Sequence, residues 1–271
     1  MTDQDSLMVR SVEKAMRVLT AFGGGQPTLS IAEVAAIAGL DKSGAQRLTH
    51  TFVQLGYLRR DPETRRLALT PRVLELSAHY SRSSPLIRAA APYLLNISKI
   101  TEESVSLTVL DGTDIVYVYR LLSRNMLATD VIVGTHLPAY CTAPGIAILS
   151  GLPRDEAEAI LNASDLTAYT PFTTTDIPTL LARIDEAASQ GFAIVQDQIY
   201  MNDVSIAVPV YGPGQRAIAA VNIAVNKLSL SAAEAVEKFV PLLAPVAKNL
   251  SHAGPMPARK PLTLPKGRSR I

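Results

Sequence analysis

The sequence predicts an α+β protein of two domains, in which a small helical domain ending in a β-hairpin precedes a larger antiparallel sheet flanked by helices. The 271 residues exceed one domain of ordinary size but are too few for three. Apolar residues recur at helical spacing before residue 56 and alternate at strand spacing after residue 104. Ser and Pro residues at 81–85 separate the two patterns.

The composition is that of an ordinary folded protein. Hydrophobic residues make up 48% and charged residues 18%, which excludes a disordered, collagen-like or coiled-coil chain. A single Cys and four scattered His are too few for a zinc or iron–sulfur site, so we expect no metal and no cofactor. The acidic N-terminus is unlike a signal peptide, and no apolar run reaches the ~18 residues of a membrane span. We therefore expect a cytoplasmic protein with no membrane partner.

The net charge of +2 is unevenly distributed. Residues 1–85 contain 11 Lys and Arg against 8 Asp and Glu, residues 86–251 contain 10 against 16, and residues 252–271 contain 5 against none. An acidic middle between basic ends favours a polyanion-binding domain joined to a domain with another task. On charge alone, a solvated basic surface is an equal alternative.

Two helices are predicted in the first 38 residues. The first has Ser11 as its N-cap and apolar residues on one face as far as Phe22. The second runs over 31–38, where Ser30 and Glu33 have the spacing of a capping box, with each side chain bonding the other residue's amide.

A third helix is predicted over 42–55, after a left-handed stop at Gly39 and with Asp41 as N-cap. Its apolar face carries Ala45, Leu48, Phe52 and Leu55. Two helices joined by a glycine turn, the second with a polar outer face, are typical of a helix-turn-helix, whose second helix enters the DNA major groove. The polar face comprises Lys42, Ser43, Gln46, Arg47, Thr49 and His50. Gln46 and Arg47 suit adenine and guanine edges, and Ser43 and His50 are further candidate base readers.

A basic β-hairpin follows this helix directly. Strands are predicted on either side of the turn at 61–64, an arrangement known as a wing. Four of its residues are candidates for contacting phosphates or the minor groove: Arg59, Arg60, Arg65 and Arg66. Together with the helix-turn-helix, the wing makes DNA binding the favoured interpretation of the basic surface.

The chain divides into five predicted segments. These are a disordered N-terminus at 1–9, the winged helix-turn-helix at 10–70, a linker helix at 71–85, a sheet domain at 86–252 and a basic disordered tail at 253–271. A flexible break is expected at 81–85. The sheet domain is predicted to contain helices near 85–97, 153–161, 177–190 and 231–250 and strands at 105–109, 115–119, 192–195, 205–211 and 217–225.

The sheet domain shows no catalytic motif. The sequence lacks a Gly-x-Ser-x-Gly elbow, a Walker A loop and a dinucleotide fingerprint, so we expect no catalytic residues and no enzyme activity. Two alternatives remain open: an enzyme acting on a small aromatic acid with an accessory basic domain, and an architectural protein that binds DNA without sequence preference.

Several strings in this order resemble the IclR family of bacterial transcription regulators. They are LSIAEVAAIAGLDKSGAQRLTHTFVQLGYLRRD near the N-terminus and, later, VLDGTDIVYVYR, VGTHLPAYCTAPGIAIL and GFAIVQDQIYMNDVSIAVPVYGPGQRAIAAVNIAV. The resemblance spans about residues 8 to 252. It implies a winged helix-turn-helix joined to a GAF-like effector-binding domain, acting as a homodimer or dimer of dimers on a palindromic promoter operator. A small organic acid would be the effector.

One branch of the family senses aromatic acids of the protocatechuate and p-hydroxybenzoate pathways. The sequence is similar to that branch at LPAYCT, at Asp197-Gln198 and at 205–210, and it departs from the branch at 143–146 and 199–202. The candidate effector-binding residues are Tyr119, Arg120, Cys141, Thr142, Ala143, Gly145, Asp197, Ser205 and Asn222. Ser205 and Asn222 stand out because they are polar residues in apolar strands, which need a ligand or a neighbouring partner. For three of these residues the alternative role is favoured: a packed core for Cys141, a structured loop for Asp197 and an exposed surface for Arg120.

Overall fold

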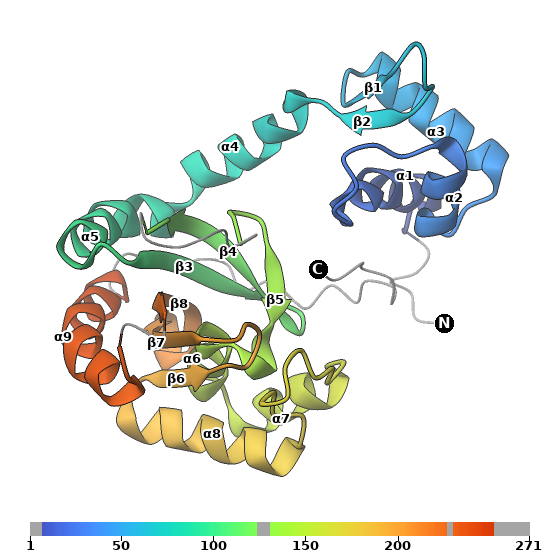
Figure 1. Cartoon of the computed structure of the whole chain (residues 1–271). Coiled ribbons are helices and arrows are strands. Elements are labelled where there is room, and N and C mark those ends of the chain that lie inside the picture. Colours follow the sequence, from blue (N-terminus) through green and yellow to red (C-terminus); the bar gives the residue numbers. More distant parts are fainter. Residues whose placement is uncertain (1–6, 124–130, 227–229, 252–271) are drawn as a thin grey trace. The chain divides into compact units, whose positions relative to one another are not determined.

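The computed structural model describes residues 7–123, 131–226 and 230–251. These residues form two compact units, one ending at Tyr80 and the other beginning at Ser81 (Figure 1). The tail predicted to be disordered at 253–271, and residues 1–6 of the N-terminal segment, lie outside the described residues. No helix within the described ranges is both long and apolar enough to cross a bilayer.

Up to residue 69, the first unit contains three α-helices and a two-stranded sheet. Its elements are α1 (Arg10–Thr20), a 3₁₀ turn (Ala21–Gly23), α2 (Ile31–Ala38), α3 (Lys42–Gln54), β1 (Leu58–Arg60) and β2 (Leu67–Leu69). Apolar side chains from all three helices and both strands pack into one core, which includes Val18, Val34, Phe52, Leu58 and Leu67. Because this core ties the hairpin to the helices, the unit has the predicted winged helix-turn-helix form.

The helix ends follow the expected capping chemistry with one exception. Ser30 and Glu33 form the predicted capping box, and Gly39 adopts the left-handed conformation with φ 63°. Asp41 caps α3 by accepting a hydrogen bond from the Gly44 amide at 2.6 Å. Ser11 is not an N-cap, because α1 begins one residue earlier and Val9 stands at its cap without a side-chain bond.

A helical connection leads to the second unit. A 3₁₀ turn (Pro71–Val73) precedes α4 (Leu74–Ser83), and α5 (Pro85–Thr101) follows after a single residue. The break expected at 81–85 is confined to Ser84 in the structure, because residues 81–83 complete α4 and Pro85 begins α5. The Ser84 hydroxyl caps α5 by accepting from the Ile87 amide, and Pro85 occupies the first turn, where its missing N–H costs nothing.

The second unit is built on a six-stranded antiparallel sheet. Its strands are β3 (Ser104–Asp111), β4 (Asp114–Leu121), β5 (His136–Pro138), β6 (Ala193–Gln196), β7 (Asp203–Tyr211) and β8 (Ala217–Asn226), in the order β5-β4-β3-β8-β7-β6. The short strand β5 was not predicted, because its three residues are too few to show an alternating pattern. The helices that accompany the sheet are α6 (Ala143–Ser150), α7 (Arg154–Ala163), α8 (Ile177–Gln190) and α9 (Ala232–Leu250), with 3₁₀ turns at Ala139–Cys141 and Pro213–Gln215.

Helices cover both faces of this sheet (Figure 1). One face, with Leu107, Ile206 and Ile223, packs on α5 and α9. The other face carries small residues such as Ala207 and Ala220 and packs on α6, α7 and α8. Ser104, Ser106 and Thr108 alternate with apolar residues on β3, and each is fully buried. The polar side of this strand therefore faces the helices α6–α8 rather than solvent.

Candidate functional site

The exposed face of α3 gathers the side chains predicted to read DNA. Ser43, Gln46, Arg47 and His50 are exposed and, with Thr51 and the wing residue Arg60, line a surface depression. Lys42 is also exposed, in the first turn of the helix. Hydrogen-bonding and cationic groups therefore converge on one helix face of the kind that suits base edges and phosphates.

Thr49 is wrongly placed in the predicted reading set. It is fully buried, and its hydroxyl donates to the Ala45 carbonyl at 2.8 Å. Conversely, Leu55 was expected in the core but is 50% exposed. The buried stripe of α3 runs through Ala45, Thr49 and Phe52, because a threonine that bonds the preceding turn satisfies its own hydroxyl and can pack like a valine.

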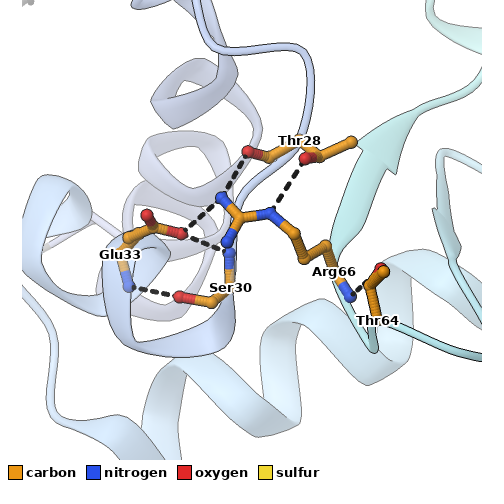
Figure 2. Close-up of polar contacts among 5 residues, drawn as sticks. All are labelled: Thr28, Ser30, Glu33, Thr64 and Arg66. Atoms are coloured by element: carbon orange, nitrogen blue, oxygen red, sulfur yellow. Dashed lines mark hydrogen bonds and ion pairs between the residues drawn. The ribbon is translucent and has the colours of Figure 1, made fainter.

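The wing arginines occupy different environments. Arg59 and Arg65 are exposed. Arg60 is half-buried at the depression, and within the described chain its Nε makes no hydrogen bond despite being buried. Arg66 instead turns back toward the helices, where Nη2 lies 2.9 Å from Glu33 Oε2 (Figure 2). Arg59, Arg60 and Arg65 are therefore better candidates for phosphate contacts than Arg66.

The wing turn is shaped by its own hydrogen bonds. Asp61 Oδ1 accepts from the amides of Glu63 and Thr64 at 3.0 and 2.8 Å, and these bonds lower the pKa of Asp61. Arg65 follows with φ 58°, in the left-handed region. This closed turn fixes where the exposed Arg65 side chain leaves the backbone.

A polar cluster lies on the α6-facing side of the sheet in the second unit. It consists of Ser106 on β3, Arg120 on β4, Ser205 on β7 and Asn222 on β8, and we call it the polar cluster below. Strand register aligns three of them, because Ser106 pairs with both Arg120 and Asn222. Arg120 Nη1 donates to Ser106 Oγ at 2.8 Å, and Asn222 Nδ2 lies 3.5 Å from Ser205 Oγ.

Asn222 is the least satisfied member of the polar cluster. It is 1% exposed, and in the described part of the chain its Oδ1 makes no hydrogen bond. Burying an amide oxygen without a partner costs roughly 1–3 kcal/mol. A ligand that donates a hydrogen bond to this oxygen would recover that cost.

Arg120 and the nearby Asp203 are charged side chains that are both partly buried. Its guanidinium carbon lies 5.2 Å from the centroid of the Tyr117 ring. Burial lowers the pKa of Arg120, and nearby Tyr117 and Asp203 oppose this shift. Burial also raises the pKa of Asp203 to about 7, against the attraction of Arg120. The polar cluster thus holds one cation, Arg120, and the nearby Asp203 carboxyl has a raised pKa.

The remaining predicted effector residues lie elsewhere. Tyr119 faces the α5 and α9 side of the sheet, opposite to Arg120. Cys141, Ala143 and Gly145 are buried in the core between the sheet and the helices α6–α8. Thr142 caps α6: its hydroxyl donates to the Pro138 carbonyl and accepts from the Gly145 amide. These contacts fit packing of α6 better than binding of an anion.

Asp197 stabilises the loop at 197–202 through hydrogen bonds. Its Oδ1 accepts from the Asn202 amide at 2.7 Å, and its backbone carbonyl accepts from the Thr170 hydroxyl. The neighbouring Gln198 side chain bonds the Phe172 carbonyl, the Thr174 amide and Arg183. Both residues of the Asp197-Gln198 pair therefore hold the 197–202 loop in place.

Sequence reasoning missed Ser106, Tyr117 and Asp203 as neighbours of Arg120. The sequence offered one signal, the hydroxyl residues at alternate positions of β3. Such residues form a buried polar row only when a helix also covers that face of the sheet, and the sequence does not show whether one does. Within the described ranges, no three His, Cys, Asp or Glu side chains gather as a metal site would require.

Comparison with known proteins gives consistent matches along the chain. Residues 11–62 match the IclR helix-turn-helix domain, and residues 78–252 match the bacterial transcriptional regulator IclR C-terminal domain. The chain is 31% identical to the Pca regulon regulatory protein of Pseudomonas putida, over 92% of this chain and 85% of that protein. It is 29% identical to the p-hydroxybenzoate hydroxylase transcriptional activator of Acinetobacter baylyi, over 89% and 90% of the two chains. The crystal structure of a transcriptional regulator from Rhodococcus sp. RHA1 is 33% identical, with a TM-score of 0.78 over 91% of this chain and 98% of that one.

Proposed function

The chain belongs to the IclR family of bacterial transcriptional regulators, and from this premise we propose that it binds a specific promoter operator and responds to a small aromatic carboxylate. The family assignment makes it a regulator rather than an enzyme. The observation that carries the DNA-binding part is the depression on α3, where five exposed hydrogen-bonding side chains meet Arg60 of the wing.

We place the operator contacts on α3 and the wing. Ser43, Gln46, Arg47 and His50 would read base edges, and Lys42, Arg59, Arg60 and Arg65 would neutralise phosphates. Arg60 supports this assignment because it lines the same depression as Ser43, Gln46, Arg47 and His50 and carries a positive charge there.

We place the effector at the polar cluster. Ser106 and the Tyr117 ring hold the Arg120 guanidinium, whose planar fork suits two carboxylate oxygens. The unsatisfied Asn222 Oδ1 would accept a hydrogen bond from a phenolic hydroxyl on the same ligand. An aromatic acid is favoured further because the P. putida and A. baylyi relatives are named for pca and p-hydroxybenzoate functions.

We also propose that the regulator acts in the cytoplasm as a homodimer or dimer of dimers on a palindromic operator. Val12 and Met16 support self-association, because they lie one turn apart on α1 and are 58% and 50% exposed. Two copies would present two α3 helices to half-sites about one DNA turn, or a multiple of it, apart. Effector binding would then change the spacing of the two helices by shifting an equilibrium between arrangements.

Two experiments test the proposal. In the first, the full-length protein selects duplexes from a random library, and footprinting locates the site and its symmetry. A failure to enrich any sequence would refute operator recognition.

In the second experiment, calorimetry measures binding of p-hydroxybenzoate, protocatechuate and the non-aromatic control succinate to the wild type, R120M and Y119F.

Arg120→Met should abolish binding of the aromatic acids, whereas Tyr119→Phe should leave it unchanged, because Tyr119 faces the opposite side of the sheet. Equal binding by wild type and R120M would place the effector elsewhere. Succinate binding as tight as that of the aromatic acids would remove the aromatic assignment.

A further inference from the structure

We propose that Arg66 is a positioning residue for DNA binding that latches the wing to the first helix of the helix-turn-helix, rather than one of the phosphate contacts. This inference rests on the proposed operator binding. It separates Arg66 from the three other wing arginines, with which it shares charge and sequence neighbourhood.

The Arg66 side chain makes three polar contacts within its own domain (Figure 2). Nε donates to Thr28 Oγ1 at 2.9 Å, and Nη2 donates to the Thr28 carbonyl at 2.9 Å and pairs with Glu33 Oε2 at 2.9 Å. The guanidinium fork thus joins the segment before α2 to a residue inside α2. Only a planar group with several fixed donors can reach these three acceptors together.

Glu33 links this contact to the start of α2. The Oε2 atom that binds Arg66 also accepts from the Ser30 amide at 2.7 Å, and the Ser30 hydroxyl accepts from the Glu33 amide at 3.3 Å. Arg66 therefore contacts the capping box itself. Movement of the wing away from α2 would break bonds at the point where the helix-turn-helix begins.

The backbone beside Arg66 provides a second connection between the same two segments. The Leu29 amide donates to the Leu67 carbonyl at 2.9 Å, and the Leu67 amide donates to the Leu29 carbonyl at 2.7 Å. Side-chain and main-chain bonds together hold the base of the wing in one place. A wing held in place loses less conformational freedom on binding DNA, so the latch should raise operator affinity without touching DNA.

Arg65 is the matched control, because it is the adjacent arginine and is exposed. The test measures operator affinity of the full-length protein by fluorescence anisotropy at several KCl concentrations, using a duplex selected by the wild type. The variants are R66A, R66K, R65A and R65K. Amide hydrogen exchange at Leu29 and Leu67 is measured for each variant without DNA.

The latch predicts that R66A and R66K both weaken binding about 10-fold at every salt concentration, with the slope of log K against log[KCl] unchanged. Lysine fails because it keeps the charge but lacks the fork. R65A should lower the slope by about 0.9, the value for one lost phosphate contact, and R65K should stay near the wild type. Exchange at Leu29 and Leu67 should accelerate in R66K but not in R65K.

Two results of the affinity measurements would overturn the latch: a slope in R66A reduced as in R65A, or wild-type affinity in R66K. If R66A does not fold, R66K alone decides between these outcomes. If the wild type binds no selected duplex, operator binding fails instead, and unchanged exchange in R66K would separately refute the latch.

Discussion

Tyr117 and Arg120 lie on the same face of β4, with the guanidinium carbon 5.2 Å from the ring centroid, although they are three residues apart. Strict alternation would place them on opposite faces. The register with β3 shifts between Leu107 and Thr108, so that Leu107 pairs with Tyr119 and Thr108 with Tyr117. This β-bulge inserts one residue, which turns Tyr117 toward Arg120 and sends Tyr119 to the other core.

We expect Arg47→Ala to weaken specific operator binding by roughly 1–3 kcal/mol if Arg47 bonds a base edge, and to relax sequence preference at that base pair. Thr49→Val is the control, because its hydroxyl bonds only within the helix in the described structure. Competition binding with operator variants measures both. Altered base preference in T49V, or unchanged preference in R47A, would contradict the assignment of the reading face.

We expect Asn222→Leu to separate stability from effector response. Leucine has a similar volume and removes the unsatisfied Oδ1, so the free energy of unfolding should stay equal or rise by up to about 1 kcal/mol. Effector affinity should fall at least 10-fold, because the acceptor for the ligand hydroxyl is lost. Thermal unfolding and calorimetry measure the two effects, and unaltered effector affinity would exclude Asn222 from the site.

The raised pKa of Asp203, about 7, predicts how Asp203→Asn changes the pH dependence of stability. An acid whose folded pKa is raised stabilises the fold while protonated, and this contribution is lost as pH rises from its unfolded value near 4 through about 7. The stability of D203N relative to wild type should therefore increase by roughly 2 kcal/mol between pH 5 and 7 and level off above about pH 8. Urea unfolding at fixed protein concentration measures this difference, and a difference independent of pH would contradict the buried carboxyl.

We expect Gly145→Ala to destabilise the second unit by about 2 kcal/mol or more, because a Cβ there would lie 2.1 Å from the Ala139 carbonyl oxygen. Gly214→Ala is a useful comparison, since nothing lies within 4 Å of its added Cβ and only its φ of 72° opposes the change. Calorimetric melting of both variants checks the order. Melting of G145A at the wild-type temperature would show that α6 can move away from the 139–141 turn.

The sequence by itself determined the helices of the first unit and the α+β fold class. The capping box at Ser30, the left-handed stop at Gly39 and the Asp41 cap are local features, in which the bonding partners lie within a few residues of each other. Periodicity likewise located α8 and most of the sheet strands, because helices and strands have different repeats along the chain.

Only the tertiary structure decided which polar side chains meet. Arg66 turns to Glu33, which is 33 positions away in sequence, although its charge matches that of the exposed Arg65 beside it. Asn222 meets Ser205 and aligns with Ser106 through strand register, and a bulge places Tyr117 and Tyr119 on opposite faces of the sheet. Register, bulges and long-range hydrogen bonds depend on partners distant in the chain, and local spacing carries no information about them.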